Sequence, residues 1–144
     1  MEKYLGLDLG TVTLGIAKSD VLGFVHGVET FRFVKGQYSK ARERVHQLVD
    51  ELGIKNIVLG LPITLHNEEG EASNRSQRFK DDLLKEDPTL NIILMDERLT
   101  SVSANRLISE MNMSHKQRKE SVDRIAACEI LDIYIRRLQN NGIR

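Results

Sequence analysis

Three carboxylates occupy positions where an acidic side chain is costly unless it has a partner or a function. Asp8 interrupts the apolar segment YLGLDL, Glu97 follows the apolar run NIILMD, and Asp123 stands beside the apolar face of the last helical segment. A carboxylate in such surroundings needs a counter-charge, a proton or a bound cation. These three acids are therefore the first candidates for chemistry.

Carboxylates that gather in one place repel one another, so one of them must hold a proton or the group must share a cation. Oxygen ligands without His or Cys favour Mg²⁺ or Mn²⁺. Two such ions, roughly 3.5–4 Å apart, can activate a water and stabilise the leaving oxygen in phosphodiester hydrolysis. This chemistry predicts that Asp8, Glu97 and Asp123 are both metal ligands and catalytic residues. The structural alternatives are a helix-dipole role for Asp123 and an ion pair between Glu97 and Arg98.

Glycines surround the first of these acids. Gly6, Gly10 and Gly15 leave room for a backbone or a phosphate to come close to Asp8. The tetrapeptide DLGT also fits a turn that offers backbone N–H groups to a phosphate, which makes Gly10 and Thr11 candidates for that contact.

Basic side chains could hold a nucleic-acid backbone near the acids. Arg75 and Arg78 are three residues apart, so they share a helix face and can grip phosphate. Arg98 could touch the scissile phosphate or orient the adjacent carboxylate. Further candidates in a polar segment are Lys116, Arg118 and Lys119. The alternatives are a solvated loop for this segment and, for the first two arginines, pairing with Glu71, Asp81 and Asp82.

The elements that would position these residues follow from the apolar pattern. Strands are expected at 3–9, 14–20 and 24–34, a helix at 39–52, a strand at 56–62, a loop at 64–74, and a helix that ends near 86. A strand at 91–95, a helix at 101–111, a polar connector at 113–121 and a final helix complete the chain. This order predicts an α/β fold with a mixed five-stranded sheet, a three-strand antiparallel meander plus two parallel strands, and helices on both faces. We expect strands 56–60 and 91–95 to flank the first strand, so that Asp8 and Glu97 meet.

Composition narrows the class of protein. The 144 residues suit one domain over 1–144, with 40% hydrophobic and 29% charged residues. Apolar runs are too short to cross a membrane, the start of the chain does not have the order of a signal peptide, and one cysteine excludes an internal disulfide, so a cytoplasmic location is expected.

The net charge is zero, which argues against a non-specific nucleic-acid coat protein. Residues 50–97 nevertheless carry 5 basic against 11 acidic side chains, and residues 98–144 carry 9 against 5, so one positive face is possible.

Four motifs occur in order along almost the whole chain: GLDLGTVTLGIAKSD, IVLGLP, DERLTS and VDRIAACEIL. Together they resemble the YqgF family, also called RuvX, of RNase H-like nucleases, and the segment RSQRF matches it too. The resemblance implies an RNase H-like fold and a divalent-metal nuclease whose acids match Asp8, Glu97 and Asp123. Members of the family are regarded as processing the 5′ end of the 16S rRNA precursor and were earlier proposed to resolve Holliday junctions. The chain departs from the family pattern at Ser103, at Glu129 and in the loop after Pro62.

The resemblance implies structured RNA or branched DNA as partner, no membrane, and a monomer or homodimer. Two other classes of protein are alternatives. An ATP-binding domain of the actin, Hsp70 and sugar-kinase type has a similar first phosphate loop, but it needs a second lobe with its own DxG turn, which this sequence lacks. A catalytically silent ribosome-assembly factor is disfavoured because all three acids are present. The sequence leaves open RNA against four-way junction, Mg²⁺ against Mn²⁺, cleavage polarity and oligomeric state.

Overall fold

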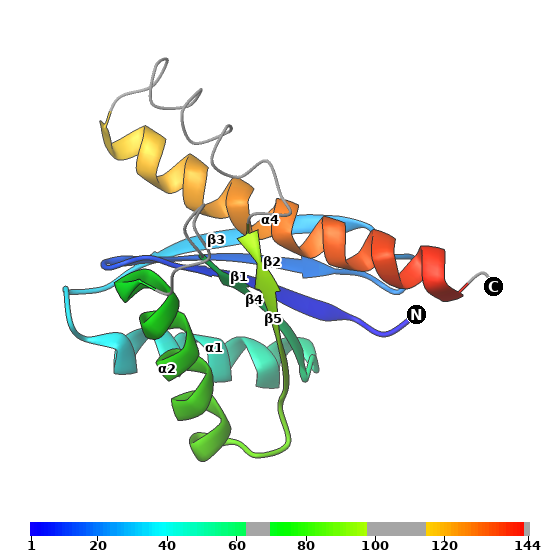
Figure 1. The fold of residues 1–144 in the computed structure, drawn as a ribbon, viewed down its shortest axis with the longest axis horizontal. Helices are drawn as coiled ribbons and strands as arrows, with labels where there is room; N and C mark the ends of the chain where they lie inside the picture. Colours follow the sequence, from blue (N-terminus) through cyan, green and yellow to red (C-terminus); the bar gives the residue numbers. More distant parts are fainter. Residues whose placement is uncertain (63–69, 98–114, 143–144) are drawn as a thin grey trace.

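The computed structural model describes residues 1–62, 70–97 and 115–142, with the side chains of 115–122 and 142 outside the description. Figure 1 shows the sheet with its helices. The elements in chain order are β1 (Tyr4–Leu9), β2 (Thr13–Ser19), β3 (Val25–Arg32), α1 (Tyr38–Leu52), β4 (Asn56–Leu61), α2 (Glu71–Glu86), β5 (Asn91–Asp96) and α4 (His115–Gly142). None of the helices described combines the length and apolarity that crossing a membrane requires.

The five strands form one mixed sheet in the order β3-β2-β1-β4-β5. The first three strands pair antiparallel, and β4 pairs parallel with both β1 and β5. The predicted meander with two parallel strands is therefore confirmed. The expectation that the strand at 91–95 lies beside the first strand is wrong, because β4 lies between β1 and β5. The crossover through α2 carries the chain from β4 to the next strand away from β1, which leaves β5 at the edge.

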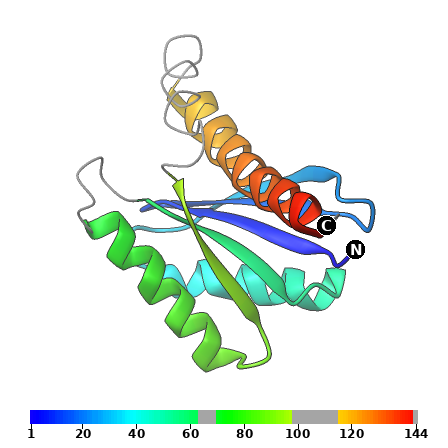
Figure 2. The same cartoon turned by 45° about the vertical axis from the view of Figure 1, so that its right-hand side comes forward.

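Helices cover both faces of the sheet, as predicted, and each face has its own apolar core. Figure 2 shows α1 and α2 against one face and α4 against the other. Large aliphatic side chains such as Leu7, Ile16 and Leu59 fill the core under α1 and α2. Ala17 and Val58 meet α4 on the opposite face, together with the larger Tyr4 and Met95.

The helix predicted at 39–52 is α1, and its apolar periodicity is the reason it packs where it does. Its buried residues are Ala41, Val45, Leu48 and Val49, which recur at helical spacing and form one stripe against the sheet. Gly53 ends the helix in the left-handed conformation at φ 65°, and its N–H donates to the carbonyl of Val49.

Two helix starts differ from the sequence-based expectation. Helix α2 begins at Glu71, inside the expected loop 64–74, and Glu71 places a negative charge in its first turn. Helix α4 begins at His115, within the expected connector 113–121. Its first turns read HKQRKE, which contains good helix formers and no breaker, so polarity there does not mean a loop. Residues 64–69 of the expected loop and the helix predicted at 101–111 lie outside the described residues.

Candidate active site and a basic cleft

The side chain of Asp8 lies on the α4 face of the sheet, near the carboxyl end of β1. Its neighbours Leu7 and Leu9 belong to the core under α1 and α2, and side chains alternate between the faces of a strand. Asp8 is only 5% exposed and pairs with Gly15 of β2 across the antiparallel ladder. The sheet therefore presents this buried carboxylate toward the helix that carries Asp123.

The backbone of α4 meets the sheet at Gly15. A Cβ atom at Gly15 would lie 2.0 Å from the carbonyl oxygen of Asp123, so only a glycine permits this approach. The hydroxyl of Thr13 donates a hydrogen bond to Oδ2 of Asp123, and both side chains are buried. Asp123 is thus held over β2, beside the position that pairs with Asp8.

Glu97 reaches the same face from the opposite side. It follows Asp96, the last residue of β5. A Cβ atom at Gly60 would lie 3.2 Å from its Oε1 atom, so the carboxylate leans over β4. Because Leu7 pairs with Leu59, Asp8 and Gly60 are the next residues along two neighbouring strands. The missing side chain at Gly60 gives Glu97 a path toward Asp8 although β4 separates their strands.

The three predicted acids are therefore brought to one face of the sheet, over the three adjacent strands β2, β1 and β4. Neighbouring strands lie about 4.8 Å apart. Within residues 1–62, 70–97 and 115–142, no three His, Cys, Asp or Glu side chains are already close enough to hold one metal ion together. The acids therefore share one face without being closed around a single point. Their donor atoms are all carboxylate oxygens, the class that Mg²⁺ and Mn²⁺ take.

Of the two uses expected for the glycines around Asp8, Gly6 and Gly15 serve the approach of a backbone. Helix α4 takes the space above Gly15, and a Cβ atom at Gly6 would lie 2.8 Å from the carbonyl oxygen of Ala127. The N–H of Gly10 donates to the carbonyl of Thr13 at 2.8 Å, within the β1–β2 turn. The opening expected for a phosphate above Gly6 and Gly15 is filled by the helix, because a glycine lets a backbone approach as readily as a ligand.

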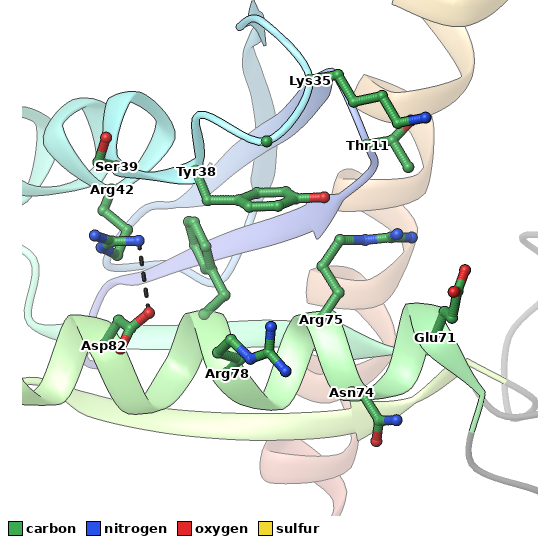
Figure 3. Close-up of a pocket in the computed structure, with 12 residues that line it drawn as sticks. Thr11, Lys35, Tyr38, Ser39, Arg42, Glu71, Asn74, Arg75, Arg78 and Asp82 are labelled. Carbon is green, nitrogen blue, oxygen red and sulfur yellow. Dashed lines mark ion pairs between the residues drawn. The ribbon is translucent and has the colours of Figure 1, made fainter.

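A basic cleft of about 710 Å³ opens at the α1 and α2 side of the molecule. Figure 3 shows it between the β1–β2 turn, the start of α1 and the first turns of α2. Its lining includes four cations and two acids: Lys35, Arg42, Arg75, Arg78, Glu71 and Asp82. Thr11 lies at the rim. The cleft therefore brings the predicted pair of arginines together with cations that the sequence did not single out.

The cations of the basic cleft differ in whether they form ion pairs. Arg42 pairs with Glu86 at 3.1 Å and with Asp82 at 3.6 Å. Lys35, Arg75 and Arg78 have no ion pair among the described residues. Asp82, one of the acids proposed as a partner for the arginines, pairs with Arg42.

Glu86 is held by two neighbours at the far end of α2. Burial by itself would raise the pKa of its carboxyl, but hydrogen bonds from His46 and Arg42 outweigh burial and hold this pKa below its ordinary value. His46 Nε2 lies 2.9 Å from Oε1 of Glu86. This cluster neutralises Arg42, so the free positive charge of the cleft lies toward its other end.

Sequence reasoning missed two residues that matter here. Thr13 is a polar residue whose side chain lies on the α4 face and is buried. That burial marks it as a residue with a partner, and it is known only from the structure. Lys35 precedes Gly36, whose φ of 88° marks a tight turn; such Lys-Gly pairs at strand ends can present a cation. Among the other predicted contacts, Arg98 lies outside the described residues, as do the side chains of Lys116, Arg118 and Lys119.

The chain was compared with protein families and with other proteins. Residues 2–137 match the model of a family described as "RuvX: Holliday junction resolvase". A protein of Geobacillus sp. (strain WCH70) is 38% identical over 134 residues, which are 92% of this chain and 96% of that protein. A protein of Staphylococcus carnosus (strain TM300) is 33% identical over 139 residues, 96% of this chain and 98% of that protein. Both carry the name "Putative pre-16S rRNA nuclease".

Among solved structures, the chain is similar to Thermus thermophilus RuvC in complex with a Holliday junction substrate. The TM-score is 0.58, with 12% identity over 96% of this chain and 97% of that chain. A second structure of Thermus thermophilus RuvC also gives a TM-score of 0.58, at 13% identity. At such identities the likeness concerns the fold, and it agrees with the RNase H-like architecture expected from the sequence.

Proposed function

Because the chain belongs to the RuvX family, we propose that it is a metal-dependent nuclease that hydrolyses phosphodiester bonds of structured nucleic acid. Its proposed substrate is the precursor of 16S rRNA, after the name that its relatives share. The observation that carries the proposal is the gathering of Asp8, Glu97 and Asp123 on the α4 face over three adjacent strands. Asp8 and Asp123, which are 115 positions apart in sequence, lie on the same face of the sheet.

The donor set fits a divalent cation. Asp8, Glu97 and Asp123 would hold Mg²⁺ or Mn²⁺, and a metal bound there would supply an activated water and charge stabilisation for the leaving oxygen. The chain itself prepares the acids. Hydrogen-bonded strands on both sides fix Asp8, and Thr13 orients the carboxylate of Asp123 by donating to one of its oxygens. Glu97, at the end of an edge strand, is partly exposed as a residue, although its Oε1 atom is buried.

A four-way DNA junction is the second candidate substrate. The description of the matching family favours it. Junction cleavage commonly uses two copies related by two-fold symmetry, because the junction itself is nearly symmetric. The two substrates use the same hydrolytic chemistry, so they are distinguished by direct comparison.

The experiment incubates the purified chain with a labelled 5′ region of precursor 16S rRNA and, separately, with a labelled four-way junction. Each is tested with Mg²⁺, with Mn²⁺ and with a chelator. We expect metal-dependent cutting of the RNA that Asp8→Asn lowers by on the order of 10³-fold or more, because several kcal/mol of transition-state stabilisation depend on the metal site. Asp50→Asn, an exposed acid on α1, is the matched control and should cut like the wild type.

Three results would count against the proposal. Cutting that survives Asp8→Asn, or that needs no metal, would reject the proposed site. Cutting of the junction with no cutting of the RNA would reject the substrate and keep the chemistry.

A further inference from the structure

The basic cleft lies across the sheet from the carboxylates, and nothing in the hydrolytic chemistry uses it. We propose that this cleft binds the backbone phosphates of a single-stranded flank of the substrate, a few nucleotides from the bond that is cut. This inference rests on the proposed function in one respect, namely that the ligand is the nuclease substrate.

The charge of the cleft favours a phosphate. Lys35 and Arg78 are exposed, Arg75 is partly buried, and none of the three has an ion pair among the described residues. Nε of Arg75 is buried and makes no hydrogen bond within the described part of the chain. A guanidinium carries five N–H donors that match phosphate oxygens. An incoming phosphate would supply acceptors for the exposed N–H groups of these side chains.

The cleft is a built site whose parts come from different elements. Figure 3 shows the Lys35 ammonium beside Thr11, with the Tyr38 hydroxyl and the Arg75 guanidinium extending toward the same end. Gly36, at φ 88°, makes the turn that places Lys35 at the rim. The ring of Tyr38 packs against Phe33 with their centroids 5.5 Å apart, so it is held in place. Donors from the β1–β2 turn, the β3–α1 turn and α2 therefore converge on one volume.

The acids of the cleft do not cancel this charge. Arg42 already pairs with Asp82. Among the residues that the structure describes, Glu71 is the one lining carboxylate without an ion pair, against the three cations Lys35, Arg75 and Arg78. The first turn of α2 adds the partial positive charge of a helix amino terminus. The end of the cleft near Thr11 is consequently electropositive.

The position of the cleft sets which part of a substrate it can hold. Thr11, at its rim, is three residues from Asp8 in the chain, which is at most about 10 Å of extended backbone. A stacked strand rises 3.4 Å per nucleotide, so this span corresponds to roughly three nucleotides. The carboxylates and the cleft lie on opposite faces, so the strand must bend over the β1–β2 turn. A stiff duplex resists such a bend, and a single strand does not.

The test measures binding without cleavage. A labelled hairpin RNA with a single-stranded 5′ flank, and the same hairpin without the flank, are titrated with protein in a chelator at several salt concentrations. The double variant Lys35→Gln/Arg78→Gln is compared with Lys85→Gln/Arg137→Gln, which removes the same charge from exposed positions outside the cleft. Fluorescence anisotropy gives the dissociation constant and its dependence on salt.

We expect the cleft variant to bind the flanked hairpin about 10-fold more weakly, with a salt slope smaller by about 2, because each phosphate contact contributes about one unit. The hairpin without the flank and the control variant should be unchanged. The inference would be overturned if the cleft variant bound the flanked hairpin with wild-type affinity and salt slope. It would also be overturned if the variant lost the same affinity for both hairpins.

Failure of this inference can be told apart from failure of the proposed function. Binding is measured without metal, so a chain that binds the flank in the cleft and never cuts refutes the nuclease alone. A chain that cuts with Asp8 intact and ignores the cleft substitutions refutes the cleft alone.

Discussion

The two faces of the sheet are built for different tasks. On the α4 face, glycines at Gly6, Gly15 and Gly60 let a helix backbone and a carboxylate approach the strands within van der Waals distance. On the other face, large aliphatic side chains hold α1 and α2 away, and a cleft of about 710 Å³ remains at one end. Buried acids are placed by rigid backbone contact on the first face. On the second face, long cationic side chains line an open cleft.

The largest structural effect should come from adding one methyl group to the tight face. Gly15→Ala places a Cβ atom 2.0 Å from a backbone oxygen of α4, and a backbone cannot rotate away as a side chain can. We expect a loss of about 3 kcal/mol in the free energy of unfolding and a loss of cleavage, since Asp123 moves with the helix. Urea denaturation and cleavage assays measure the two effects.

The control is Gly70→Ala, because a Cβ atom at Gly70 meets no atom of the described residues within 4 Å and its φ of −103° suits alanine. Near-wild-type stability in Gly15→Ala would show that α4 is not packed as described, and the contrast between the faces would fail.

A smaller effect should follow from removing the hydrogen bond that orients one acid. Thr13→Val keeps the shape of the side chain and deletes the hydroxyl that donates to Asp123. A hydrogen bond to a charged group contributes about 1.5–3 kcal/mol, so we expect a stability loss in that range and slower cleavage at unchanged KM.

Thr13→Ser restores the donor and should recover most of both losses. Equal activity in the valine and serine variants would mean that the hydroxyl does not position the carboxylate.

The smallest expected effect is on the stability of the fold at acid pH, through Glu86 on α2. The pKa of Glu86 is lowered, because hydrogen bonds from His46 and Arg42 outweigh its burial. A lowered carboxyl pKa stabilises the fold at pH above the ordinary value of 4.5, and this contribution is lost as the pH falls through the folded-state pKa. Since Glu86 is 41% exposed, solvent screens the interaction and the effect is small.

Melting temperatures of the wild type and Glu86→Gln, measured between about pH 3 and pH 6, test this. The two curves should converge toward the acid end and separate toward pH 6, with the wild type more stable. A constant difference across the range would rule out the ionised carboxylate as its source.

Much of the fold could be predicted from local pattern, because burial and periodicity act over a few residues. The strand around Asp8, the helix ending at Gly53 and the mixed sheet all follow from it. The start of α4 could not, because the polar residues from His115 onward form a helix by propensity and not by burial. The place of β5 at the sheet edge also escaped prediction, since strand order depends on contacts between distant segments.

The sequence by itself determined the chemistry available to this protein: three acids in apolar surroundings, without His or Cys partners at ligand spacing, and motifs that define its family. Only the tertiary structure decided that Thr13 supports Asp123 and that Glu97 passes over Gly60. It also brought Lys35 of one turn to Arg75 and Arg78 of a later helix. Residue types are set by the chain, whereas distances between remote residues are set by how closely backbones can approach, and here glycines determine that approach.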